Sequence, residues 1–403
     1  MKKLLLSLFL ACGLSAMAQG GYQDGVDNYN AGRLDVAKVI LNNTLNDAST
    51  DKGVAYYYLG CIDMNDKNIA EAKSNFEKGI QANSHNGYNL IGLGEIALRN
   101  GDKPGAEKYF KEAIATDKKN PALLVAVARA YYNVNPTLYA KEIDKNIQKA
   151  LKDSKNTEAA AYILLGDMQA AEDPGNAAGQ YEMAISQDQA KGNVNREAYV
   201  KYANTYFRVN PKFAISKLEE LNKLEPNSAL AQRELAEKYY DNEQFGSACL
   251  QYGKYMENPN HFQSDEQRYA GLLFSAGEHA KSLELAKKIL AEDPENYFME
   301  RVVLLNHSSE SQYSEAIKAA ENLFNNPNAK LIPNDYILYA EALSGVGQDS
   351  AAIEIFKKAV ELNPDKPELL AKLSQAYDKG GNPEASVETM KKYLELGNGS
   401  VND

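Results

Sequence analysis

The side chains that most often carry out chemistry in proteins are few in this chain and stand far apart. The four histidines lie in different parts of the sequence, at His85, His261, His279 and His307. No two of them have the one-turn spacing that a metal site on a helix uses, and neither Cys61 nor Cys249 is close to any of them in sequence. We therefore predict no metal site and interpret the histidines as surface or hydrogen-bonded side chains.

Motifs for phosphate binding and for nucleophilic catalysis are also absent from the sequence. No glycine-rich loop is followed by Lys-Ser or Lys-Thr, and there is no Gly-x-Ser-x-Gly elbow. Carboxylates are abundant, but most stand beside lysines, as Glu107 does beside Lys108, which is typical of the solvated face of a helix. The sequence therefore predicts a protein that is not an enzyme and that binds no cofactor.

The composition is that of a folded, acidic protein. Apolar residues make up 44% of the 403 residues and charged residues 25%, and the formal net charge is -11. A net negative charge repels phosphate backbones and anionic lipid headgroups. We therefore expect neither nucleic acid nor a membrane surface as a direct partner.

The first residues have the three parts of a signal peptide. Lys2–Lys3 is a basic segment, Leu4–Leu14 is apolar, and Ala16–Ala18 is a small-x-small cleavage site. The apolar segment has the length expected of a signal peptide and is too short to span a bilayer. The sequence therefore predicts a signal peptide at residues 1–18, with cleavage before Gln19.

A second interpretation of the same segment is open. Phe9–Cys12 resembles a bacterial lipoprotein box in which Cys12 would carry the lipid, although Phe9 is a poor first residue and the Ala-x-Ala site is better formed. We expect export to the periplasm of a Gram-negative bacterium or to its outer membrane, with lipidation of Cys12 as the alternative. No later stretch reaches ~18 consecutive apolar residues, so we expect no membrane span.

One pattern of small, aromatic and turn residues recurs along the chain. Its clearest copy lies in Pro333–Lys366, where intervals of five, four, three and five residues separate Gly347, Ala352, Phe356, Ala359 and Pro364. Further copies place matching residues at Leu59, Gly60, Ala72 and Phe76, and at Leu93, Gly94, Ala106 and Phe110. The pattern resembles the tetratricopeptide repeat, a helix–turn–helix unit of ~34 residues.

The spacing has a physical cause. Small residues let the helices approach closely, an aromatic or Leu side chain fills the gap to the next unit, and Gly and Pro end the two helices. One unit cannot bury its apolar face alone, so neighbouring units must stack. Without the signal peptide the chain holds about eleven units of ~34 residues. We predict an all-α, right-handed superhelical solenoid of about 22 helices over residues 19–396, followed by a disordered tail at residues 397–403.

The resemblance implies a place where a partner binds. In tetratricopeptide-repeat proteins the first helices of the units line a concave groove that binds other proteins. Carried over position by position, the resemblance implies as groove candidates Tyr57, Tyr88, Ile91, Arg129, Tyr132, Asn204, Phe207 and Arg208. Aromatic, aliphatic and arginine side chains are typical of protein-binding surfaces. The alternative also stays open, that the superhelix closes up and these side chains pack on each other.

The last predicted helix carries an apolar face that no following unit covers, formed by Val387, Met390, Tyr393 and Leu394. Repeat arrays normally end in a helix with a polar outer face. Our hypothesis is that this face docks a partner or mediates self-association with a second copy.

Together these features favour one function and leave a second open. We expect an exported scaffold or adaptor that binds protein or peptide partners through its concave groove. The alternative is a periplasmic module whose groove binds a glycan, a peptidoglycan fragment or a small molecule. An enzyme is the third interpretation, and no motif in the sequence favours it.

Overall fold

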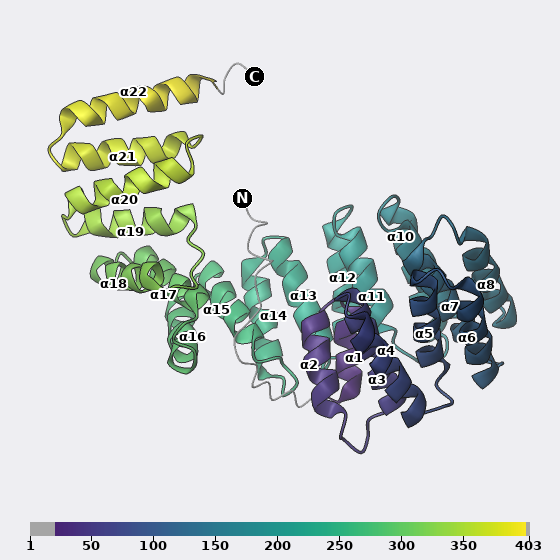
Figure 1. Cartoon of the computed structure of the whole chain (residues 1–403). Helices are drawn as coiled ribbons and strands as arrows, with labels where there is room; N and C mark the ends of the chain where they lie inside the picture. Colours follow the sequence, from purple (N-terminus) through teal and green to yellow (C-terminus); the bar gives the residue numbers. More distant parts are fainter. Residues whose placement is uncertain (1–20, 400–403) are drawn as a thin grey trace. The chain divides into compact units, whose positions relative to one another are not determined.

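The computed structural model describes residues 21–399, and this part of the chain is all-α (Figure 1). It contains 22 helices and no strand, which confirms the predicted fold class. The predicted signal peptide, the cleavage before Gln19 and the lipidation of Cys12 lie outside the described residues, as does the end of the predicted tail at residues 400–403.

The described residues fall into two compact units, which divide between Gln263 and Ser264. The helices of the first unit are α1 (Tyr22–Asn30), α2 (Leu34–Thr44), α3 (Lys52–Asn65), α4 (Ile69–Ala82), α5 (Gly87–Arg99), α6 (Lys103–Thr116), α7 (Pro121–Val134), α8 (Ala140–Asp153), α9 (Ala159–Gln169), α10 (Pro174–Gln189), α11 (Arg196–Tyr206), α12 (Pro211–Leu224), α13 (Ala229–Asp241) and α14 (Phe245–Glu257). Those of the second are α15 (Asp265–Ser275), α16 (His279–Glu292), α17 (Tyr297–Ser309), α18 (Tyr313–Asn325), α19 (Pro333–Gly345), α20 (Asp349–Leu362), α21 (Pro367–Lys379) and α22 (Pro383–Gly399).

Within each unit the helices pack in the order in which they follow one another. Most odd-numbered helices pack chiefly on the even-numbered helix that comes next, and the following odd-numbered helix then packs on that pair. In the first unit, for example, α3 pairs with α4, and α5 contacts both of them. This is the arrangement expected of stacked helix–turn–helix units.

Local sequence explains where many of the helices begin and turn. Asn86, Asn120 and Ser228 precede α5, α7 and α13, and the side chain of each accepts a hydrogen bond from a backbone N–H of the first turn. Gly101 and Gly347 lie in the turns inside two pairs, with φ of 78° and 79°. Only glycine adopts this left-handed conformation without strain, so the turn glycines of the pattern stand where they are needed.

The core is built from aromatic rings packed against glycine. A Cβ atom on Gly60 would lie 2.4 Å from the ring of Phe76, and one on Gly92 would lie 2.5 Å from the same ring. Phe76 thus fills the space between its own pair, α3–α4, and the next first helix, α5. Gly94 in α5 meets the ring of Phe110 in the same way, at 2.4 Å. The close approach that the spacing predicts is therefore present.

Over residues 21–399, no helix combines the length and the apolar character that a membrane span requires.

The glycine–ring contact gives the first testable prediction. Gly94→Val should lower the free energy of unfolding by about 1–3 kcal/mol, because the buried Phe110 ring has no room to move. Gly179, inside α10, has open space around it, so Gly179→Ala should stabilise the protein by about 0.5–1 kcal/mol. Chemical unfolding followed by circular dichroism measures both. Equal effects of the two substitutions would contradict this account of the packing.

Candidate functional site

The first helices of successive pairs in the first unit are joined by a ladder of charged side chains. The Arg129 guanidinium in α7 donates to the Asp167 carboxylate in α9 at 2.7 Å, and the Lys201 ammonium in α11 donates to the same carboxylate at 2.9 Å. The Tyr181 hydroxyl adds a third donor at 2.9 Å. Burial acts to raise the pKa of Asp167, but Arg129 and Lys201 together hold it below its ordinary value.

Two further carboxylates on these helices are less well compensated. Asn133 in α7 donates to Glu95 in α5 at 3.2 Å, and Arg99 pairs with Glu95 at 2.7 Å. Glu197 in α11 lies 3.8 Å from the Lys201 ammonium. Burial raises the pKa of both Glu95 and Glu197 in spite of these cations. Each of these two carboxylates is therefore harder to ionise in the folded protein than it would be in water.

A cluster of tyrosines continues the ladder toward the first helices. The ring centroids of Tyr29 and Tyr58 are 5.0 Å apart, those of Tyr58 and Tyr57 are 5.2 Å apart, and those of Tyr57 and Tyr88 are 5.4 Å apart. Cys61 lies among them, and burial raises the pKa of its thiol to about 12. A thiol with this pKa stays protonated at neutral pH and is a poor nucleophile.

The first helix pair closes this face of the first unit. Helix α1 contacts α11 and α13, although 169 residues separate Asp27 in α1 from Arg196 in α11 and α13 lies still further along the chain. The Arg196 guanidinium at the start of α11 donates to Asp27 in α1 at 2.7 Å and to Glu225, after α12, at 2.9 Å. Burial raises the pKa of Asp27, and Arg196 offsets part of that effect. One arginine thus links the first pair to the sixth.

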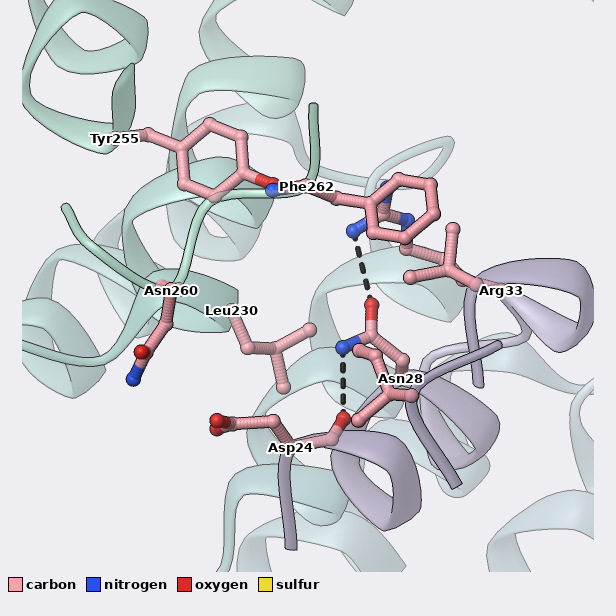
Figure 2. Close-up of a pocket in the computed structure, with 10 residues that line it drawn as sticks. Asp24, Asn28, Arg33, Leu230, Tyr255, Asn260 and Phe262 are labelled. Carbon is pink, nitrogen blue, oxygen red and sulfur yellow. Dashed lines mark hydrogen bonds between the residues drawn. The ribbon is translucent and has the colours of Figure 1, made fainter. Parts of the chain in front are cut away.

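Apolar side chains complete the contact between α1–α2 and the helices that they meet. Leu230 and Phe262 line one small cavity together with Asp24 and Asn28 of α1, and Figure 2 shows Leu230 on the side of Asp24 and Phe262 on the side of Arg33. The amide of Asn28 joins the main-chain oxygen of Asp24, at 2.7 Å, to the guanidinium of Arg33, at 2.9 Å. The cavity that these residues line measures about 10 Å³, enough for one water molecule at most. We call this contact the seam, and it is a packing interface rather than a ligand site.

The structure brings together some of the groove candidates and separates others. Tyr57 and Tyr88 contact each other, and Arg129 and Tyr132 both reach Asp167. Ile91 is buried in the core, with 3% of its surface exposed. In this part of the face the side chains therefore pack on each other and do not line an open groove.

The three candidates at the end of α11 differ from the others. Asn204 and Arg208 are exposed to solvent, and Phe207 is half-buried beneath the Lys238 ammonium, which lies 5.3 Å from the ring centroid. The next residues are exposed as well: Val209 shows 52% of its surface and Phe213, in the first turn of α12, shows 58%. We call residues 204–213 the α11–α12 corner.

Sequence reasoning missed Asp167, Lys201 and Arg196, which hold these helices together. A usable signal existed for the first of them. Asp167 stands in the fifth unit at the position that Arg129 occupies in the fourth, so opposite charges meet when the units stack. No comparable signal marks Arg196, because its partner Asp27 lies 169 residues away.

The described residues 21–399 contain no group of three or more His, Cys, Asp or Glu side chains that could hold a metal ion.

Comparison with known proteins gives the following similarities. Models of the tetratricopeptide repeat match residues 57–121, 336–366 and 367–396. Cellulose synthase operon protein C of Komagataeibacter xylinus is 34% identical over 98 residues, which is 23% of this chain and 7% of that protein. Cellulose synthase 1 operon protein C of the same organism is 28% identical over 127 residues, which is 30% of this chain and 10% of that protein. The chain thus spans a tenth or less of these relatives.

Solved structures that align with most of the chain share little sequence with it. The APC/C hetero-tetramer Cut9–Hcn1 is 10% identical with a TM-score of 0.40, and the alignment covers 94% of this chain and 93% of that one. Yeast Tom70 is 12% identical with a TM-score of 0.37, covering 93% and 91%.

The seam gives a second prediction. Arg196→Gln should lower the stability of the first unit by about 1–3 kcal/mol, because Asp27 and Glu225 lose their shared donor. Loosening α1 should also expose Cys61, since Tyr29 of α1 lies beside it. In a chain that lacks residues 1–18 and carries Cys249→Ala, Cys61 is the sole cysteine, so a thiol reagent reports on it alone. Arg208→Gln, at an exposed arginine, is the control. Equal labelling rates in both variants would contradict the role of the seam.

The raised pKa of Glu197 gives a third prediction. Because the folded state disfavours the charged carboxylate, the cost is present at neutral pH and disappears as pH falls below the unfolded pKa of about 4.3. Glu197→Gln should therefore be more stable than the parent at pH 7, and the gain should vanish near pH 4. The pKa of Glu142 is lowered by Lys103, so Glu142→Gln should shift stability in the opposite direction. Urea unfolding at pH 7 and at pH 4 measures the stability of each variant. A loss of stability for Glu197→Gln at pH 7 would refute the argument.

Proposed function

This chain is a tetratricopeptide-repeat protein, and we propose that it is an exported, non-catalytic scaffold that binds protein or peptide partners. Stacked helix pairs of this kind form stiff, extended surfaces suited to holding other chains. The relatives named above share only a short stretch with it, so their names supply no partner. Export to the periplasm or the outer membrane is supported by the basic, apolar and small-residue segments of residues 1–18.

The observation that carries the proposal is the accessible α11–α12 corner. Arg208, Val209 and Phe213 are exposed there, next to the half-buried Phe207. Asn210 caps α12 through the backbone N–H of Phe213, which fixes the start of that helix. Arginine and aromatic side chains held on rigid elements dominate the binding energy of protein interfaces. Arg208 and the nearby exposed Lys212 favour a partner segment that presents an acidic residue beside apolar ones.

The remaining groove candidates are held in contacts within the fold, so the partner would not meet them first. A partner that reached Tyr57, Tyr88 or Arg129 would have to displace tyrosine contacts or the ion pair with Asp167. Breaking such a partly buried pair leaves an uncompensated charge, which is costly. Tyr132 and Ile91 are held in the same way, by Asp167 and by the core. We therefore assign the first contact to Asn204, Phe207 and Arg208. We propose a second contact as well, in which the protein associates with itself through α22.

The corner gives a fourth prediction. The double variant Arg208→Glu, Phe213→Ser should bind its partner at least ten times more weakly, because it loses one cation and one exposed ring. Quantitative mass spectrometry of proteins captured from the exported fraction, followed by titration of the recovered partner, measures this. Leu250→Ser is the matched control, since Leu250 in α14 is also strongly exposed but lies outside the corner.

The outcome that would overturn the proposal is equally specific. Capture of no protein above background, or binding that the double variant leaves unchanged, would refute the scaffold assignment to this corner. Binding of cell-wall fragments or another glycan without any protein partner would instead favour the ligand-binding module.

A further inference from the structure

Helix α22 presents an apolar face to solvent. Val387 and Leu394 expose 56% and 53% of their surfaces, and Met390 between them is half-buried. The three side chains follow the i, i+3, i+7 spacing that places residues on one side of a helix. Pro383, one turn before Val387, extends the same row and is exposed as well.

The preceding pair shows what such a row normally does. In α20 the corresponding positions, about 34 residues earlier, are Ile353, Phe356 and Val360. There α21 packs on them, and Ile353 and Phe356 expose only 9% and 4% of their surfaces. The row on α22 therefore has the pattern of a helix that receives another helix. The described residues of the second unit place none on it.

Charged residues flank the row on one side. Glu384 and Lys391 each follow a member of the row by one residue and stand seven residues apart, so they lie along the same edge of the helix. Both are exposed. Residues at such flanking positions select the partner and the orientation of paired helices.

We propose that α22 pairs in antiparallel orientation with α22 of a second copy of this chain. About a twofold axis, Val387 of each copy faces Met390 of the other, and Leu394 faces Pro383. This register also places Glu384 of each copy beside Lys391 of the other, which forms two symmetric ion pairs. In a parallel arrangement the same edge of the two helices would lie on opposite sides of the interface, so Glu384 of one copy could not reach Lys391 of the other and the two ion pairs would not form.

The occupant follows from this self-complementarity. An isologous interface requires one surface to match itself under a twofold rotation. Here one register satisfies the apolar row and both charges at once, and it uses no residue from elsewhere in the chain. The inference does not depend on the α11–α12 corner, which lies in the other unit.

The first test measures oligomeric state. The purified full-length protein should show a reversible monomer–dimer equilibrium by sedimentation equilibrium, and Val387→Glu with Leu394→Glu should abolish it. Leu362→Glu is the control, because Leu362 in α20 is exposed to 55% but lies off the row, so its variant should still dimerise. A protein that stays monomeric at the highest attainable concentration, or a dimer that survives the double variant, would overturn the proposal.

The second test addresses the register and does not depend on disrupting the apolar row. Glu384→Lys alone and Lys391→Glu alone should each weaken dimerisation roughly tenfold, because each creates two like-charge contacts. An equimolar mixture of the two single variants should restore it, since each then meets its opposite charge. The chain carrying both substitutions should also regain the parent affinity. Circular dichroism confirms that helix content is unchanged, and a mixture as weak as the single variants would refute the antiparallel register.

Discussion

A helix pair in this chain has more apolar surface than it can bury by itself, and the rest of the structure depends on that constraint. The ring of Phe76 shows how it acts, because the ring meets Gly60 of its own pair and Gly92 of the next. One side chain thus completes two pairs, and neither is finished until the other is stacked. Small and aromatic residues recur at a fixed spacing in the sequence because each helix pair makes this contact with the next.

Stacking also determines which charges meet. Arg129 and Asp167 stand at equivalent positions of successive first helices, and Lys201 of the next first helix also reaches Asp167, so cations lie on both sides of this carboxylate. Partly buried ion pairs add little net stability, since desolvation offsets their attraction. Their contribution is to register, because a shift in the stacking would separate Asp167 from Arg129 and Lys201 and leave a partly buried carboxylate without its cations. The tyrosine cluster beside them needs no such device, since ring contacts tolerate small shifts in packing.

Contacts between residues close in sequence can be predicted from the sequence. Contacts between distant repeats cannot, because they depend on small rotations that add up from pair to pair. The fold follows from contacts within ~34 residues, such as Gly94 with Phe110, so it can be predicted from the repeated spacing and the repeat family that this spacing resembles. The seam joins Asp27 to Arg196 across 169 residues and exists because small rotations from pair to pair add up. Within their own repeats, Asp27 and Arg196 cannot be told apart from ordinary surface charges by sequence alone. The same accumulated rotation decides that Tyr57 and Tyr88 are packed while Asn204 and Arg208 are exposed, so the sequence could propose candidate residues but could not predict which of them are accessible.

Binding and folding are therefore governed by the same interaction in this protein. Where a first helix follows, as α21 follows α20, it covers the apolar row and the surface becomes core. Where the chain meets itself, as at the seam, side chains such as Leu230 and Phe262 become buried without a partner molecule. The surfaces left for other molecules are those that neither a following helix nor a distant part of the same chain covers. Phe213 and Val387 are examples, because each is an apolar side chain of the kind found in the interior that stands exposed on such a surface.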